Sequence, residues 1–207
     1  MRLFACLTVA SIVCIGSPAH ADKPAPPLTY TTMVANGKYI FVMISPWTAE
    51  EEIRFYQPES RAKIKALRDR YQKGGLYKND GSKDPLWTVD WFRFDVDVSS
   101  DGVHLVRHGE WPLLSGKFRE KDRAPSKKDL GQEAVSFFAN GKPVAHHTIG
   151  ELVGDATKLP MSVSHFMWWK DKRFDDDRKI VEIVTLDRMA FTFDIKTGKI
   201  VDRKKAN

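Results

Sequence analysis

The sequence predicts a mainly β fold of the α+β class, an antiparallel β-sandwich or curled meander sheet with a helical insertion near residues 48–73. Short runs alternate apolar with polar residues, Asn-Gly and Asp-Gly pairs separate several of these runs, and one stretch alone has helical spacing. A small propeller-like arrangement is the alternative, because hairpins such as FDIKTGKIV resemble those of propeller blades. The chain would supply only about four blades, however, so the sandwich is favoured.

The N-terminus has the pattern of an export signal. Arg2 precedes an apolar run from Leu3 to Ile15, and a small-x-small cleavage site ends at Ala21. We therefore expect a signal peptide over residues 1–21 and a periplasmic or secreted protein. The apolar run is shorter than the ~20 residues that cross a bilayer, so we expect no membrane-spanning segment.

Composition narrows the class of partner. Both cysteines, Cys6 and Cys14, lie in the predicted signal, so the mature protein is expected to be disulfide-free. The chain has 33 basic and 27 acidic residues, which are spread along its length. This distribution argues against nucleic acid as a partner and indicates a charge that keeps the protein in solution. Because the chain is expected to be exported, an envelope protein or glycan is the expected partner.

Three segments are expected along the chain: the signal peptide, a proline-rich disordered leader at 22–27 (DKPAPP), and a single β-rich domain at 28–203. The domain begins with two extended runs joined at Asn36-Gly37, a pair that suits a two-residue hairpin turn.

The helical insertion follows this hairpin. Thr48 and Glu51 have the spacing of a capping box, and Pro58 divides the insertion in two. The second half ends at Gly74-Gly75, so we expect two short helices or one broken one.

The remaining sequence predicts about eight to ten strands in total. Phe92, Phe94, Val96 and Val98 alternate with charged residues, as in a half-buried strand. Asn140-Gly141 predicts a second hairpin, and Pro143 places the strand after it at a sheet edge.

The last third reads as a meander, with a strand at 189–196 that turns at Thr197-Gly198. Residues 163–169 are apolar on both strand faces and predict an interior strand, with DKRFDDD as the polar turn that follows.

Four residues are candidate ligand contacts. Trp87 and Trp91 would share one strand face about 13 Å apart, a spacing that suits an extended ligand. His165 and Trp168 join them from the interior strand.

We expect no cofactor and no metal site. His104 and His108 would lie too far apart on one strand to share an ion, and adjacent His146 and His147 would point to opposite faces. No nucleophile motif marks a catalytic residue.

Several motifs carry a family resemblance: IGELV (149–153), SVSHF (162–166), TLD (185–187) and FDIKTGKI (193–200). With LYKNDGSKDPLWTVDW and VSSDGVHLVRHGEW, they resemble a family of exported bacterial β-rich proteins of unknown function. The resemblance implies an exported domain and brings no activity with it.

The leading hypothesis is an exported, non-enzymatic β domain that binds a protein or cell-envelope ligand. The alternative is a hydrolase that acts on envelope polymers, with His165 and an acid such as Asp175 as its polar centre. Whether the protein is an enzyme stays open, with the absence of a catalytic signature favouring binding.

Overall fold

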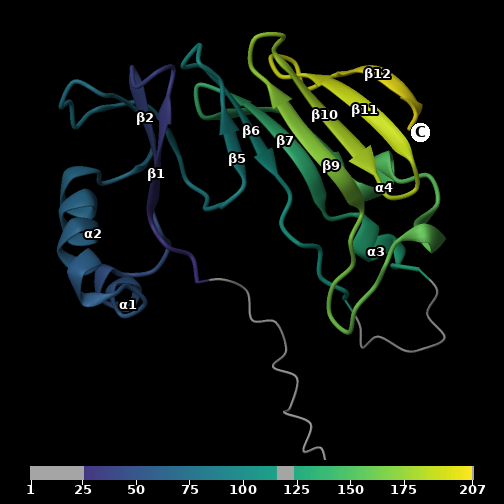
Figure 1. Cartoon of the computed structure of the whole chain (residues 1–207), viewed down its shortest axis with the longest axis horizontal. Helices are drawn as coiled ribbons and strands as arrows, with labels where there is room; N and C mark the ends of the chain where they lie inside the picture. Colours follow the sequence, from purple (N-terminus) through teal and green to yellow (C-terminus); the bar gives the residue numbers. More distant parts are fainter. Residues whose placement is uncertain (1–25, 116–123, 207) are drawn as a thin grey trace, which may run out of the picture.

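Three four-stranded antiparallel sheets stack face to face in a computed structural model of the chain (Figure 1). The structure describes residues 26–115 and 124–206, so the predicted signal peptide and most of the predicted leader lie outside the described residues. The prediction of a mainly β fold with a helical insertion is confirmed. The number of strands, twelve in the described residues, exceeds the prediction.

The first sheet contains the helical insertion. Its strands and the helices between the second and third of them are β1 Tyr30–Val34, β2 Tyr39–Met43, α1 Ala49–Ile53, α2 Pro58–Arg70, β3 Gly74–Lys78 and β4 Pro85–Val89. The predicted capping box is present, since the Thr48 hydroxyl accepts from the Glu51 backbone N–H and the Glu51 carboxylate accepts from the Thr48 N–H.

The second sheet is formed by the next four strands, with one short helix before its third strand and another after its fourth. These elements are β5 Val96–Val98, β6 His104–His108, α3 Lys127–Leu130, β7 Glu133–Ala139, β8 Lys142–Thr148 and α4 Ile149–Leu152. A 3-10 turn at Ala156–Lys158 follows. The third sheet comprises β9 Trp169–Asp175, β10 Ile180–Thr185, β11 Met189–Asp194 and β12 Ile200–Lys205.

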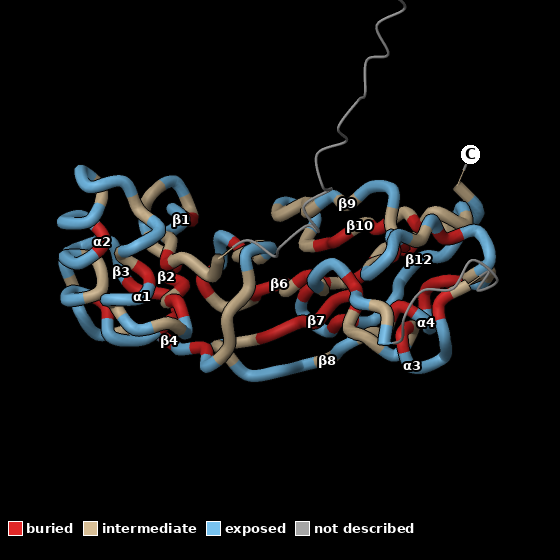
Figure 2. Tube along the Cα trace, turned by 90° about the horizontal axis from the view of Figure 1, so that it is seen from below, coloured by how far each residue is buried: buried red, intermediate tan, exposed pale blue. Residues whose placement is uncertain are grey.

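The second sheet is the middle layer and has both faces covered. Leu105 and Phe138 pack with the first sheet, whereas Val106 and Phe137, their neighbours in sequence, pack with the third. Successive side chains of a strand point to opposite faces, so strands β6 and β7 supply apolar residues to two separate cores. Figure 2 shows the resulting buried runs in β6, β7 and β10, and the exposed edge strand β8.

Helix α2 covers the outer face of the first sheet, where Leu67 and Tyr71 pack on Val42 and Tyr77 (Figure 1). A buried ion pair ties the two helices to the start of the domain. Glu52 has no exposed surface, and its carboxylate accepts hydrogen bonds from Thr29 and from Arg68 of α2. Each sheet consists of four consecutive strands, as in a propeller blade, but the three described sheets form a stack that does not close into a ring.

Both Asn-Gly turns are present, with one difference in length. Asn140-Gly141 is the predicted two-residue turn, since Ala139 pairs with Lys142, and β8 is the edge strand that Pro143 predicts. The first turn is centred on Asn36-Gly37 but spans four residues, because Val34 pairs with Tyr39. Ala35 has a φ of 52°, which takes it out of the extended strand, so the predicted two-residue length is wrong.

The predicted strand through Phe92 and Phe94 is wrong. Strand β4 ends at Val89 and β5 begins at Val96, and the chain between them crosses from the first sheet to the second. Without a neighbouring strand to pair with, Phe92 and Phe94 pack their rings on Tyr30 instead. The Tyr30 hydroxyl donates to the backbone carbonyl of Arg93 at 2.7 Å.

The predicted interior strand at 163–169 is also wrong, because regular pairing begins only at Trp169. Val163 is 81% exposed, and the segment 161–168 pairs only through isolated bridges. Most of the predicted polar turn is β9 itself, which is polar because it lies at the edge of the third sheet.

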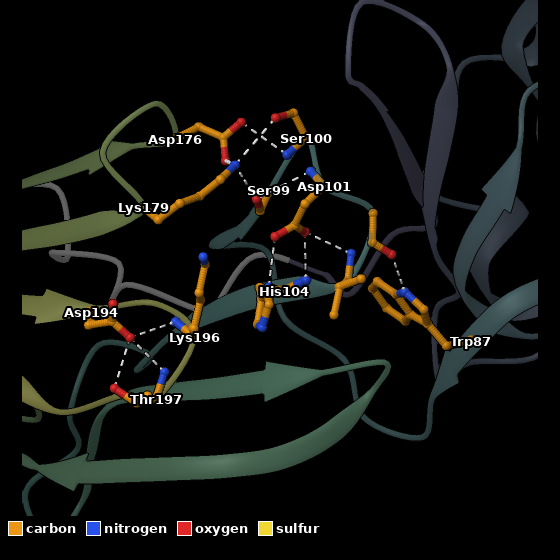
Figure 3. A network of polar contacts seen from close by, with 12 residues as sticks. Trp87, Ser99, Ser100, Asp101, His104, Asp176, Lys179, Asp194, Lys196 and Thr197 are labelled. Carbon is orange, nitrogen blue, oxygen red and sulfur yellow. Dashed lines mark hydrogen bonds and ion pairs between the residues drawn. The ribbon is translucent and has the colours of Figure 1, made fainter.

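Polar side chains join the second sheet to the third at the turn between β9 and β10 (Figure 3). Asp176 accepts from Lys179 Nζ at 2.7 Å and from the Ser100 backbone N–H at 3.0 Å, and Lys179 also donates to Ser99 Oγ at 2.8 Å. Burial raises the pKa of Asp176, but hydrogen bonds from Lys179, Ser100 and Ser99 outweigh it and hold this pKa below its usual value.

We expect Asp176→Asn to lower the free energy of unfolding by about 1–2 kcal/mol at pH 7, because the amide loses the ionic hydrogen bond to Lys179. A depressed carboxyl pKa stabilises the fold above the unfolded-state value of ~3.9, and the gain is lost as pH falls towards the folded-state pKa. Chemical denaturation at pH 7 and pH 3 should therefore show the gap from the wild type shrinking in acid.

Asp177→Asn is the matched control, since Asp177 is exposed in the same turn, and it should cost less than ~0.5 kcal/mol. An equal cost for both variants, or a gap that persists at pH 3, would contradict the role given to Asp176.

Candidate functional site

Trp87, one of the four candidate ligand contacts, is buried in the core between the first and second sheets. Its indole N–H donates to the Gly102 carbonyl at 2.8 Å, which fixes β4 to the turn before β6 (Figure 3). Its ring packs on Phe41 with centroids 6.0 Å apart. The structure therefore places Trp87 in the core, and it does not share a strand with Trp91.

Trp168 is 2% exposed and lies in the core between the second and third sheets. Its indole nitrogen has no hydrogen-bond partner within the described residues. Trp168 does not line the depression described below, so it is part of this core and not of the candidate site.

His165 is half-buried on the irregular segment before β9. Its Nδ1 lies 2.7 Å from Ser164 Oγ, and its ring meets that of Trp111 edge-on, with centroids 6.0 Å apart. Trp111 is 61% exposed, and Leu113, Val163 and Met167, which belong to the same two segments of the chain, are exposed as well. Sequence reasoning did not predict the contact of Trp111 with His165. The two residues are far apart in sequence, and an isolated bridge between Leu113 and His165 brings their segments together.

The structure does not bring His165 to Asp175. Asp175 ends β9, six residues beyond Trp169, which corresponds to ~20 Å along a strand. Its carboxylate lies 3.5 Å from Arg173 and 3.7 Å from Arg178. The two residues proposed as a hydrolytic centre therefore belong to different surroundings.

Of the four candidate ligand contacts, Trp91 alone lines a depression of about 470 Å³. The depression lies on the second sheet, beside the first sheet. This volume lies within the ~300–1,000 Å³ of small-molecule sites. The lining residues come from the β4–β5 link and from β6, β7 and β8: Asp90, Trp91, Arg107, Glu133, Ser136, Phe138, Gly141, Pro143, Val144, Ala145 and His146.

The tip of the β7–β8 hairpin closes one end of the depression against β4. Gly141 has a φ of 75°, and a Cβ atom there would lie 2.1 Å from the Thr88 carbonyl oxygen. The positive φ and the close approach of the Thr88 carbonyl oxygen both exclude a side chain at this position. Glycine therefore allows the hairpin to lie directly against the first sheet.

Arg107 forms one wall. Its Nε and Nη2 donate to the two carboxylate oxygens of Glu133 at 2.9 and 2.5 Å, a bidentate pair. The guanidinium also lies 4.6 Å from the centroid of Trp91 and 5.0 Å from that of Phe138. These contacts hold the guanidinium plane rigid while Nη1 makes no hydrogen bond within the described residues.

Ser136 and His146 form the floor and the opposite wall. Arg107 pairs with Ser136 across β6 and β7, and Ser136 pairs with His146 across β7 and β8, so the three side chains form a row on one face. Ser136 is 3% exposed, and its hydroxyl has no hydrogen-bond partner in the part of the chain described. A buried polar group without a partner is costly, which sets this hydroxyl apart from an ordinary core serine.

The chemistry of the depression is that of polar recognition. Arg107 offers donors, Asp90 and Glu133 offer acceptors, and Ser136 and His146 offer both. Within residues 26–115 and 124–206, no group of three or more His, Cys, Asp and Glu residues is placed to hold a metal ion.

Sequence reasoning named Trp91 as a ligand contact and left open Ser136 with a histidine as a nucleophile and its base, but it named none of the polar lining residues as a ligand contact. One signal was present, because Ser136 is the single polar residue in the apolar run AVSFFA of β7. The alignment of Arg107 with Ser136 and His146 depends on strand register, which single-sequence patterns do not supply.

The chain matches no protein-family model, no curated protein and no solved structure. Among the helices of the described residues, none is long and apolar enough to cross a membrane.

We expect Arg107→Lys to lower the free energy of unfolding by roughly 1–3 kcal/mol, because an ammonium group cannot form the bidentate pair with Glu133 or stack on Trp91. Urea denaturation measures this change. Arg173→Lys is the control, since the Arg173 side chain is 65% exposed, and it should cost less than ~0.5 kcal/mol. Equal costs would mean that the stacked pair adds nothing to the fold.

Proposed function

We propose that this protein is an exported, non-enzymatic β domain that binds a cell-envelope ligand in the depression beneath Trp91. The observation that carries the proposal is a ligand-sized depression lined by Trp91, by the stacked Arg107–Glu133 pair and by Ser136, whose buried hydroxyl has no partner among the described residues. A bound molecule would supply the missing hydrogen bond. The motif resemblance to exported bacterial β-rich proteins supports only the export part of the proposal.

Two observations favour binding over hydrolysis. His165 and Asp175 lie in separate surroundings, as their contacts above indicate. In the depression, Ser136 and His146 are neighbours across the sheet, yet the Ser136 hydroxyl has no hydrogen bond to a base. A serine nucleophile requires such a base within hydrogen-bond reach.

The export part of the proposal predicts a processed N-terminus. Expression of the full chain in a bacterial host should yield a mature protein that begins at Asp22, because the small-x-small site ends at Ala21. Intact-mass measurement of the periplasmic and culture fractions checks this. Unprocessed protein confined to the cytoplasm would contradict export.

The binding part predicts that Trp91→Leu reduces retention of an envelope ligand. Tagged mature protein is incubated with an envelope extract from its own source, and the retained molecules are compared by mass spectrometry. We expect a species that the wild type retains and Trp91→Leu loses, because leucine removes the aromatic wall and the Arg107 stack.

Trp111→Leu is the matched control, since Trp111 is an exposed tryptophan outside the depression and should leave retention unchanged. His146→Ala, at an exposed position of the wall, repeats the test if Trp91→Leu lowers the unfolding midpoint. Retention of the same species by all variants, or by none including the wild type, would overturn the proposal.

A further inference from the structure

We infer that the ligand of the depression is a neutral saccharide unit, bound through hydroxyl groups that both donate and accept hydrogen bonds. This inference rests on the proposed function and adds the chemical class of the ligand. It follows from the unpaired hydroxyl of Ser136, from the mixture of donors and acceptors around it, and from the charge of the walls.

Ser136 supplies the polar group on the floor of the depression. Its hydroxyl is buried and has no partner among the described residues, and it lies between Arg107 and His146 in the cross-strand row. A ligand hydroxyl restores this hydrogen bond in either direction, because a hydroxyl is a donor and an acceptor at once.

The walls place planar donors and acceptors side by side. Arg107 uses Nε and one N–H of Nη2 on Glu133, which leaves three of its five N–H donors for a ligand. The carboxylates of Asp90 and Glu133 line the same space. Neighbouring hydroxyls of a sugar ring satisfy both kinds of group, whereas a ligand made only of donors or only of acceptors leaves half of them unpaired.

Charge disfavours an anionic ligand. The carboxylates of the lining, Asp90 and Glu133, outnumber its one guanidinium, that of Arg107. The Arg107 charge is already paired with Glu133, whose oxygens lie 2.5 and 2.9 Å away. A phosphate or uronate would meet uncompensated negative charge from Asp90.

The edge of β8 disfavours an extended peptide. An added strand pairs through evenly spaced backbone groups, but Pro143 has no N–H and the register of β8 shifts between Phe137 and Phe138 of its neighbour β7. Apolar surface from Phe138, Pro143 and Val144 lines the same space and suits the C–H face of a sugar ring.

Isothermal titration of the mature protein tests the ligand class with defined probes. The neutral probes are cellobiose, maltose and N,N′-diacetylchitobiose; digalacturonate is the anionic probe, the glucosamine disaccharide is the cationic probe, and a Gly-Ser tetrapeptide is the peptide probe. We expect saturable binding of at least one neutral disaccharide and none of the charged or peptide probes.

Ser136→Ala supplies a readout that a purely structural role would not produce. We expect the Kd for the neutral probe to rise about tenfold, since one hydrogen bond is lost. The midpoint of thermal unfolding should not fall, because the variant removes a buried hydroxyl that has no partner without ligand. Ser164→Ala, whose hydroxyl contacts His165 outside the depression, should change neither quantity.

Four results overturn the inference. If only an anionic, cationic or peptide probe binds, the saccharide class is wrong and the proposed function stands. If no probe binds while the envelope extract still yields a Trp91-dependent ligand, the same conclusion holds. If neither the probes nor the extract yield a ligand, both proposals fail. An unchanged Kd in Ser136→Ala, with a neutral probe bound, would place the saccharide elsewhere and overturn this site.

Discussion

Burial of the middle sheet on both faces is the constraint on which the rest of the structure depends. Strands β6 and β7 direct Leu105 and Phe138 to one core and Val106 and Phe137 to the other. Strand alternation makes these two cores inseparable, because a shift of one residue in the register of β7 would exchange the two sets of side chains. The first and third sheets are held in place by the middle sheet, and the described residues form no core between these two outer sheets.

The candidate site follows from incomplete coverage of this middle sheet. The first sheet packs on β5, β6 and the end of β7, and no residue of β8 belongs to that core. The uncovered face beside β4 forms the depression, with Trp91 at the boundary. Polar residues occur on this face where apolar ones would otherwise pack, and the Arg107–Glu133 pair with its aromatic stack keeps them ordered.

The sequence predicted an aromatic binding surface but not which tryptophans would be exposed on it. Six tryptophans in the chain favoured an aromatic binding surface, and Trp91 does line the depression. Trp87 and Trp168 are buried, the first in the core between the first and second sheets and the second in the core between the second and third sheets. The exposure of an indole depends on whether another sheet packs over it, and the sequence of a single strand does not show which sheet that is.

The sequence by itself determined the β-rich class, the two-part helical insertion with its Thr48 capping box, the Asn140-Gly141 turn and the edge position marked by Pro143. These features depend on local backbone preferences and on the period of side chains along a strand. Only the tertiary structure decided that three sheets stack, that residues 163–168 leave regular pairing, and that Arg107, Ser136 and His146 align on one face. Those outcomes depend on contacts between residues distant in sequence, whose register and cover are fixed by packing of the whole chain.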